Sequence, residues 1–215
     1  MKPRLLFATC LCLIAVTNGF PIHAQEKLEK ILVGVAGLSG ALAHAFIPKD
    51  AGLYEKYGLD VDLVFFQGGT QAIQATLAGG IQLAVTAGPE IIHARVNGSD
   101  MIMIAGYMNT MPYSIVTDKN IVKFEQLKGT KTAISRFGST SELAVRFALE
   151  KNGLVPGKDV TIVQLGDQST RFAALTGGSV QSTLISPPFD ITAKKMGIRS
   201  LATWRISDCR TSMRR

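Results

Sequence analysis

Short apolar runs alternate with helix-like stretches along the chain from Leu28 onward. The runs are nearly continuous rather than alternating with polar residues, which predicts strands that are buried on both faces. They occupy Ile31–Val35, Val61–Phe66, Leu83–Ala87, Met101–Ala105, Tyr113–Thr117, Thr132–Ser135, Val160–Leu165 and Thr183–Ser186. Such strands, separated by helices, predict an α/β fold with mostly parallel sheet covered by helices on both sides.

Proline, glycine and hydroxyl residues mark the expected helix ends. Pro48 suits the first position of a helix, and Gly58 suits the left-handed residue that would close the same helix. Ser139 and Glu142 have the spacing of a capping box, in which Ser139 caps a helix and Glu142 reaches back to it.

An internal repeat divides the chain into two similar parts. The segment 75–80 (ATLAGG) matches the segment 173–178 (AALTGG) at an offset of 98 residues. A period this long predicts two similar α/β lobes, because solenoid repeats are shorter. We expect a signal segment over 1–24, a first lobe over 25–107, a hinge crossing over 108–112, a second lobe over 113–200 and an atypical tail over 201–215.

The N-terminal segment has the three-part order of a secretory signal peptide. Lys2 and Arg4 precede the apolar run Leu5–Val16, which Asn18 ends, and a polar stretch begins after Ala24. Twelve apolar residues are too few to span a bilayer, which needs about 20. We therefore expect cleavage after Ala24 and a periplasmic mature protein, although a buried N-terminal helix is the alternative for such a run.

The charge and the cysteines lie mostly outside the expected lobes. The net charge is +7, with a pI of about 9.5. Residues 1–24 carry +2 and residues 203–215 carry +3 (four arginines and one aspartate), which leaves +2 on the body. No basic field or aromatic groove then points to nucleic acid. Of three cysteines, only Cys209 lies outside the signal segment, so no internal disulfide is expected.

A glycine-rich turn follows the first predicted strand. Its glycines at positions 34, 37 and 40 have the spacing GxxGxxG rather than GxGxxG. The next strand ends at Phe66 without an acidic residue for a ribose hydroxyl, which argues against a dinucleotide site. The turn exposes backbone N–H groups at a helix start, where an anion is favoured. Glycines needed only for the turn explain the pattern equally well.

Several other loops follow predicted strands with hydroxyl, glycine or arginine residues. Arg136 offers a planar fork for a carboxylate or sulfonate, although a plain capping box with a solvated arginine remains open. Ligands of open α/β sheets bind beyond the carboxyl ends of the strands, so we expect these loops to face one cleft between the lobes. The candidate ligand-binding residues are Ser39, Gly40, Gln67, Gly68, Gly69, Thr70, Thr86, Gly88, Arg136, Gly138, Ser139, Thr140, Ser141 and Pro188.

Signatures of catalysis are weak in this sequence. His44 and His93 lie in predicted helix interiors, no Cys/His or His/Glu spacing suggests a metal, and no GxSxG elbow is present. We therefore expect no catalytic residue, no metal and no cofactor.

Several motifs together resemble one family. They are the segment 51–64 (AGLYEKYGLDVDLV), Gln67–Gly69, Leu77–Gly80, Leu127–Gly129, Gly138–Ser141 and Pro187–Phe189. The chain resembles the periplasmic substrate-binding proteins of ABC transporters for nitrate, sulfonate, taurine and bicarbonate-type ligands, a superfamily that includes binders of thiamine precursors. The resemblance implies a type II periplasmic-binding-protein fold that captures a small anionic or polar solute in an interlobe cleft. It also implies a monomer that docks to an inner-membrane permease.

One departure and two alternatives accompany this resemblance. Family members are longer, and their chain returns from the second lobe to complete the first, so we expect this chain to be truncated or frameshifted, with its pattern lost after Leu201. A pyrimidine-precursor synthase-like enzyme is one alternative, disfavoured because the body has no cysteine before Cys209. The solute receptor of a tripartite carrier is the other, and neighbouring transporter genes would distinguish it.

Overall fold

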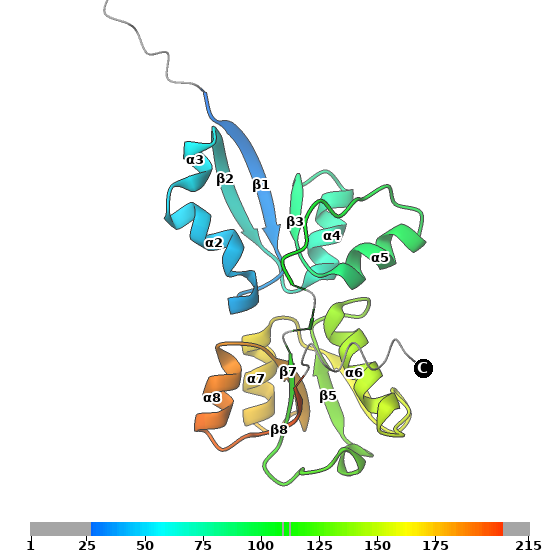
Figure 1. The fold of residues 1–215 in the computed structure, drawn as a ribbon. Coiled ribbons are helices and arrows are strands. Elements are labelled where there is room, and N and C mark those ends of the chain that lie inside the picture. Colours follow the sequence, from blue (N-terminus) through cyan, green and yellow to red (C-terminus); the bar gives the residue numbers. More distant parts are fainter. Residues whose placement is uncertain (1–26, 109, 112, 204–215) are drawn as a thin grey trace, which may run out of the picture.

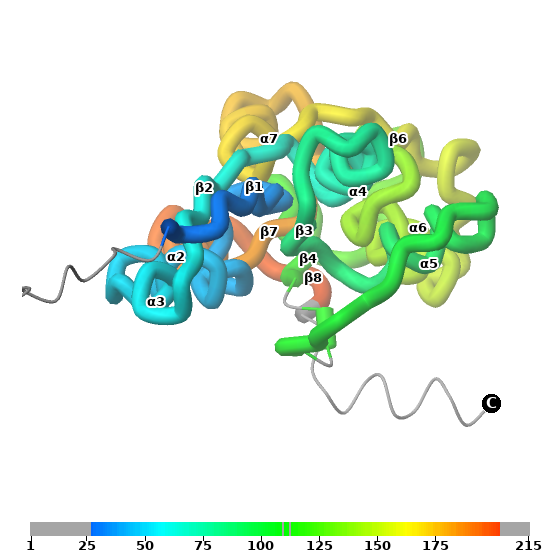
Figure 2. The backbone as a smooth tube through the Cα atoms, turned by 90° about the horizontal axis from the view of Figure 1, so that it is seen from above, coloured from blue at the N-terminus to red at the C-terminus, as the bar shows by residue number. Residues whose placement is uncertain are grey.

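The computed structural model describes residues 27–108, 110–111 and 113–203. They form two α/β lobes that stand one above the other in Figure 1 and overlap when seen from above in Figure 2. The expected signal segment 1–24 lies outside the described residues. No helix within the described part of the chain is long and apolar enough to cross a membrane.

A parallel sheet of three strands forms the centre of the first lobe. The order is β2-β1-β3, and both neighbours run parallel to β1. The central strand carries the apolar run predicted from the sequence, and its Val33 and Val35 are buried together with Val61 of β2. The strands are β1 (Glu29–Val35), β2 (Leu59–Phe65) and β3 (Leu83–Val85).

Helices flank this sheet on both sides of its strands (Figure 1). Ala72 and Ile73 pack helix α4 (Gly69–Leu77) against the sheet, and Ala72 is fully buried. The helical elements of the first lobe are the 3-10 turn η1 (Gly40–Leu42), α2 (Ala43–Asp50), α3 (Leu53–Lys56), α4 (Gly69–Leu77) and α5 (Gly88–Val96).

The second lobe has a five-stranded mixed sheet in the order β6-β5-β7-β4-β8. β5 runs parallel to β6 and β7, whereas β4 runs antiparallel to β7 and β8. The strands are β4 (Ser114–Thr117), β5 (Lys131–Ile134), β6 (Thr161–Gln164), β7 (Ser182–Ile185) and β8 (Arg199–Thr203). The helices are the 3-10 turn η2 (Phe124–Leu127), α6 (Thr140–Lys151), α7 (Gln168–Thr176) and α8 (Phe189–Lys195).

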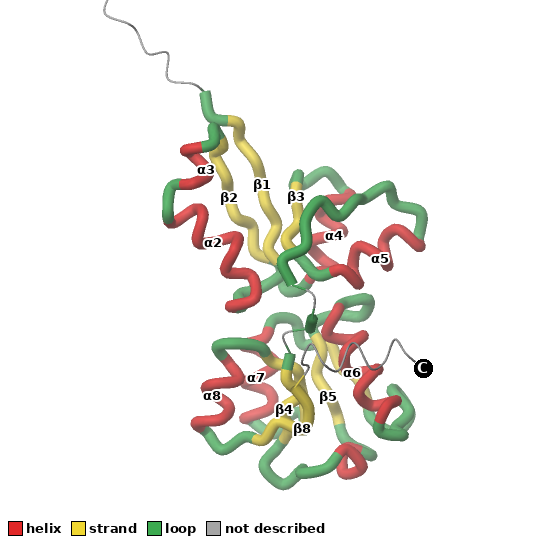
Figure 3. Tube along the Cα trace, in the orientation of Figure 1, coloured by secondary structure: helices red, strands yellow, loops and turns green. Residues whose placement is uncertain are grey.

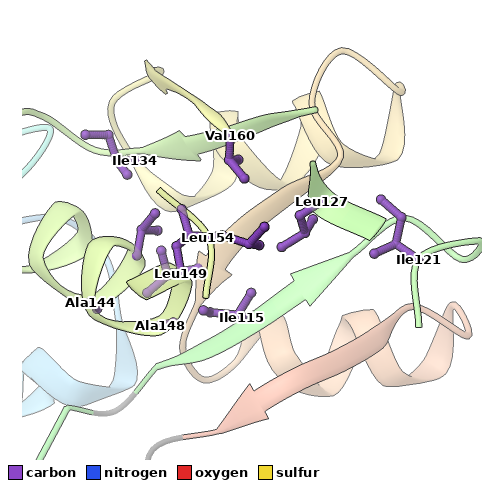
Figure 4. Packing of buried hydrophobic residues seen from close by; sticks show 11 residues of the cluster. Ile115, Ile121, Leu127, Ile134, Ala144, Ala148, Leu149, Leu154 and Val160 are labelled. Atoms are coloured by element: carbon purple, nitrogen blue, oxygen red, sulfur yellow. The ribbon is translucent and has the colours of Figure 1, made fainter. Parts of the chain in front are cut away.

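Two clusters of buried apolar residues hold the second lobe together. In the first, Ala144, Ala148 and Leu149 of α6 pack against Ile115 of β4 and Ile134 of β5 (Figure 4). The second cluster lies between the sheet and helices α7 and α8. It includes Phe172 of α7 and Ile185 of β7. Strands β4 and β7 have four buried residues each, as expected of strands covered on both faces.

The internal repeat corresponds to a repeated topology. The order β2-β1-β3 in the first lobe matches β6-β5-β7 in the second, so each lobe contains the same three-stranded arrangement, which β4 and β8 extend in the second lobe. The offset is 99 residues rather than the predicted 98 where the helices end. Helices α4 and α7 end at Leu77 and Thr176, and the left-handed glycines that follow are Gly79 (φ 72°) and Gly178 (φ 77°).

The structure corrects two helix and strand assignments in the first lobe. Pro48 lies inside α2 rather than at a helix start, and a left-handed Gly52 separates α2 from the short α3. The expected strand Met101–Ala105 is loop (Figure 3), with Ile102 and Ile104 exposed. In the second lobe the corresponding segment is β8, which pairs with β4. In the second lobe, β4 lies between β7 and β8 in the sheet. Among the described residues of the first lobe, no strand takes that place beside β3, so the backbone of Met101–Ala105 has no strand to pair with.

A third correction concerns the end of the second lobe. The apolar pattern was expected to be lost after Leu201, but residues 201–203 belong to β8. This strand was missed because, among the described strands, it lies at the sheet edge and pairs only with β4, so its sequence RSLAT needs no continuous apolar run. The rest of the expected tail, residues 204–215, lies outside the described residues.

Candidate functional site

The loops that follow the carboxyl ends of the parallel strands in both lobes face one another (Figure 1). Among the described residues, four pairs join the lobes by hydrogen bonds. Ser39 and Ser186 share a bond of 3.0 Å between their hydroxyls, and the Gly40 amide donates to the Pro187 carbonyl at 3.0 Å. The other two pairs are Thr70 with Phe137 and Thr140 with Glu90. Loops predicted separately from the sequence therefore meet at one lobe interface.

The glycine-rich turn after β1 brings the first lobe against the second. Ser39 caps η1, because its hydroxyl accepts from the Ala41 amide at 3.1 Å. A side chain on Gly40 would place its Cβ 3.4 Å from the Pro187 carbonyl oxygen. The turn thus serves a short helix and a close backbone contact between the lobes.

The turn after β2 has two glycines with different reasons for being small. Gly68 caps α4 in a conformation that favours glycine (φ 141°), and a Cβ there would lie 3.2 Å from Ser135 of the other lobe. A Cβ on Gly69 would lie 2.2 Å from Thr86 Oγ1 and 2.7 Å from Glu90 Oε1. Gly68 therefore permits approach of the lobes, and Gly69 leaves space for the Glu90 carboxylate.

Three serines at the start of α6 form a closed hydroxyl cluster. The Ser135 hydroxyl donates to Ser139 Oγ at 3.0 Å, and Ser141 Oγ lies 2.8 Å from both of these oxygens. All three residues are buried. Ser139 caps the helix as predicted, although Glu142 accepts from the Gly138 amide at 2.6 Å rather than from Ser139. The serine hydroxyls are thus satisfied within the second lobe in this conformation.

Glu90 lies at the interface, although it was not among the predicted site residues. It lies in the first turn of α5 and is only 5% exposed. Its Oε1 accepts from the Thr140 amide and its Oε2 from the Thr140 hydroxyl, both at 2.7 Å. Burial raises the pKa of Glu90, outweighing the two Thr140 donors that lower it. The available signal was an acidic residue directly after a strand-end proline, in a loop already expected to face the cleft.

The remaining candidates occupy the interface to different degrees. The Gln67 side chain lies against Gly166, where a Cβ would come within 2.9 Å of its amide oxygen. The Thr70 hydroxyl donates to the Phe137 carbonyl at 3.3 Å. A Cβ on Gly138 would lie 3.7 Å from the His93 ring of the first lobe.

Gly88 and Pro188 are not among the candidates that form the hydrogen bonds between the lobes. Gly88 faces Met103 of its own lobe, and Pro188 caps α8 while its neighbour Pro187 makes the contact.

Arg136 Nε and Thr86 Oγ1 are buried polar atoms for which the described residues provide no hydrogen-bond partner. Such atoms are rare in proteins and are places where a ligand or water completes the bonding.

Two buried polar residues of α7 hold the second-lobe loops in place, and neither was predicted. Gln168 bonds to the amide, hydroxyl and carbonyl of Ser186 at 2.8, 2.9 and 3.1 Å. Arg171 donates to the carbonyls of Gly166 and Leu184, and burial lowers its pKa to about 10. These bonds orient the loops after β6 and β7 toward the first lobe.

The described residues offer no metal-binding geometry. They contain no group of three or more histidine, cysteine, aspartate or glutamate side chains arranged to hold a metal ion. The His44 ring stacks on Tyr107 with centroids 4.1 Å apart, and His93 lies beside Gly138.

Most of this chain matches one known protein family. The family model described as "NMT1/THI5 like" matches residues 41–207. YtlA of Bacillus subtilis (strain 168), which carries the provisional name of a binding protein, is 26% identical over 178 residues. That match covers 80% of this chain and 53% of YtlA. The chain thus spans about half the length of this curated relative.

Solved structures share the fold. The periplasmic aliphatic sulphonate binding protein SsuA from Escherichia coli is 26% identical with a TM-score of 0.60, over 81% of this chain and 57% of SsuA. The alkanesulfonate-binding protein SsuA from Xanthomonas axonopodis pv. citri, bound to MOPS, is 21% identical with a TM-score of 0.67. That match covers 82% of this chain and 62% of the other. The predicted periplasmic-binding-protein fold and the resemblance are confirmed.

Proposed function

Because the chain belongs to the NMT1/THI5 like family, we propose that it is the extracytoplasmic solute-binding component of an ABC importer. The proposed ligand is a small anionic or polar organic solute, such as a sulfonate or carboxylate, held between the lobes. The likeness to a sulphonate-binding protein of Escherichia coli supports this class of ligand. Export through residues 1–24, a monomeric state and docking to an inner-membrane permease belong to the same proposal.

One observation carries the proposal for this chain. Polar groups from both lobes gather where the strand-end loops meet, and two of these loops carry the buried atoms Arg136 Nε and Thr86 Oγ1, which have no partner among the described residues. Unsatisfied buried donors and hydroxyls favour a ligand rich in oxygen atoms, since it would complete their hydrogen bonds. The predicted site residues, including Ser39 and Thr70, supply further polar groups on the first lobe.

The proposed mechanism is capture followed by closure. A solute that contacts both lobes stabilises the closed arrangement over an open one by the difference in its affinity for the two. The crossing between the lobes, residues 108–112, would act as the hinge, as in other two-lobed binding proteins. The closed protein would then be the form that a permease receives.

Calorimetric titration with short alkanesulfonates and carboxylates tests the proposal. We expect at least one of them to bind and Arg136→Ala to weaken it by about 1.5–3 kcal/mol, the range for a hydrogen bond to a charged group. Arg199→Ala is the matched control, because Arg199 is exposed on β8 away from the loops. Equal affinity in the Arg136 and Arg199 variants would remove Arg136 from the site. Failure of every acid to bind would refute the solute class.

A further inference from the structure

The carboxylate of Glu90 lies at the N-terminus of a helix that belongs to the other lobe. Helix α6 begins at Thr140, and both the amide and the hydroxyl of this residue donate to Glu90, at 2.7 Å each. Glu90 itself comes from α5 of the first lobe. The contact is buried, since Glu90 and Thr140 are 5% and 4% exposed. A charged group of the chain therefore occupies the helix end that an anion favours.

The surroundings of Glu90 keep it in this position. Gly69 leaves space for its carboxylate, because a Cβ there would lie 2.7 Å from Oε1 and 2.8 Å from Cδ. On the α6 side, the neighbouring hydroxyls of Ser139 and Ser141 are bonded to each other and to Ser135. Thr140 thus supplies the donors at this helix end that reach across the interface, and Glu90 uses both of them.

We propose that Glu90 is a tethered competitor for acidic solutes, a positioning residue that holds the lobes together without a solute and disfavours solutes whose acidic group would bind at Thr140. This inference rests on the proposed solute-binding function. A group attached to the same chain acts at a high effective concentration, so a free anion must displace it to reach the same donors. An acidic group placed elsewhere at the interface would also meet the negative field of Glu90.

Two consequences follow for the lobes and for selectivity. Without solute, the Glu90–Thr140 contact should protect the Thr140 amide from hydrogen exchange, because the amide becomes free only when the lobes separate. With solute, removal of the charge on Glu90 should favour anions and leave neutral molecules of the same shape unaffected. Glu90→Gln retains a hydrogen-bond acceptor without the charge, whereas Glu90→Ala removes both.

The first experiment measures amide exchange on the full chain without added solute. We expect Glu90→Ala to speed exchange at Thr140 at least tenfold, while the Thr170 amide remains unchanged as a control because its acceptor, Asp167, lies in the same lobe. Glu125→Gln, a change at an exposed glutamate, should leave both amides as in the native chain. Unchanged exchange at Thr140 in Glu90→Ala would overturn the role of Glu90 in holding the lobes.

The second experiment compares two probes of similar shape, methanesulfonate and dimethyl sulfone. We expect Glu90→Gln to bind methanesulfonate at least tenfold more tightly than the native chain and to bind dimethyl sulfone equally. Unchanged or weaker methanesulfonate binding would overturn the competitor role. If the native chain and every variant fail to bind either probe, the competitor role also falls. The exchange experiment uses no solute, so it still decides whether Glu90 joins the lobes even if the proposed function is wrong.

Discussion

Replacing Gly69 by alanine should destabilise the interface that the Glu90 carboxylate forms with Thr140. The added Cβ would lie 2.2 Å from Thr86 Oγ1 and 2.8 Å from Glu90 Cδ, both well inside van der Waals contact. Neither neighbour moves away easily. Thr86 is β-branched and stiff at χ1, and the Glu90 carboxylate is held by two bonds to Thr140.

The expected magnitude follows from two opposing effects. Overpacking of a well-packed site costs about 1–3 kcal/mol. Alanine gains at most about 1 kcal/mol over glycine in a helix, and Gly69 is the first residue of α4, where this gain is smaller. If Glu90 gives way instead, a hydrogen bond to a charged group, worth about 1.5–3 kcal/mol, is lost. We expect a net loss of about 1–2 kcal/mol, or roughly 2–8 °C in Tm.

Thermal unfolding and amide exchange at Thr140 check this expectation. Gly106→Ala is the matched control, because a Cβ at Gly106 would meet no atom within 4 Å and the residue lies in a loop. The control should stay within about 0.5 kcal/mol of the native chain. The reasoning is refuted if Gly69→Ala melts at or above the control and keeps the Thr140 amide protected.

Three further predictions concern the second lobe and pH. Leu149→Ala should lower the unfolding free energy in urea by about 2–5 kcal/mol, because Leu149 is buried in the α6 cluster. Asp167→Ala should cost about 0.5–2 kcal/mol in thermal unfolding, since the carboxylate caps α7 by accepting from the Thr170 amide at 2.8 Å. Burial raises the pKa of Glu90 above the value of about 4.3 for an unfolded glutamate, so ionising Glu90 costs the folded chain some stability as the pH rises from that value through the raised pKa, while the two hydrogen bonds from Thr140 remain. The unfolding free energy of the native chain relative to Glu90→Gln should therefore fall as the pH rises above about 4.3 and through the raised pKa. Tyr113 does not obscure this change, because burial, together with a smaller effect of the Glu90 charge, raises its pKa above the usual value of about 10 and keeps it neutral. If the difference in unfolding free energy between the native chain and Glu90→Gln stays constant as the pH rises above about 4.3, burial does not raise the pKa of Glu90.

Local patterns predicted much of the fold. The strands from Ile31, Val61, Thr132 and Thr183 were found within two residues of their expected ends, because continuous apolar runs are typical of strands buried on both faces. The cap at Ser139 was also predicted, since capping depends on the nearest few residues. The repeat indicated two lobes, which the matching strand orders confirm.

Elements whose partners are distant in sequence were predicted less well. The segment Met101–Ala105 has the composition of a strand but lacks a neighbouring strand among the described residues. Conversely, β8 has an unremarkable sequence and forms because β4 offers a free edge. Backbone pairing depends on what lies alongside, which a local pattern does not specify.

In the candidate site, too, features set by nearby residues were predicted, whereas contacts between distant residues were not. The sequence by itself determined the strand-end loops, their glycines and their hydroxyl groups, and therefore where polar groups of the two lobes gather. Only the tertiary structure decided that the hydroxyls of Ser135, Ser139 and Ser141 bind one another and that Glu90 crosses to Thr140. Glu90 and Thr140 are 50 residues apart, and a contact of that kind depends on how the lobes pack together. Helix capping and the burial of a strand depend on residues that are close in sequence, so a local pattern predicts them. A hydrogen bond between the lobes forms only after both lobes have folded and packed together.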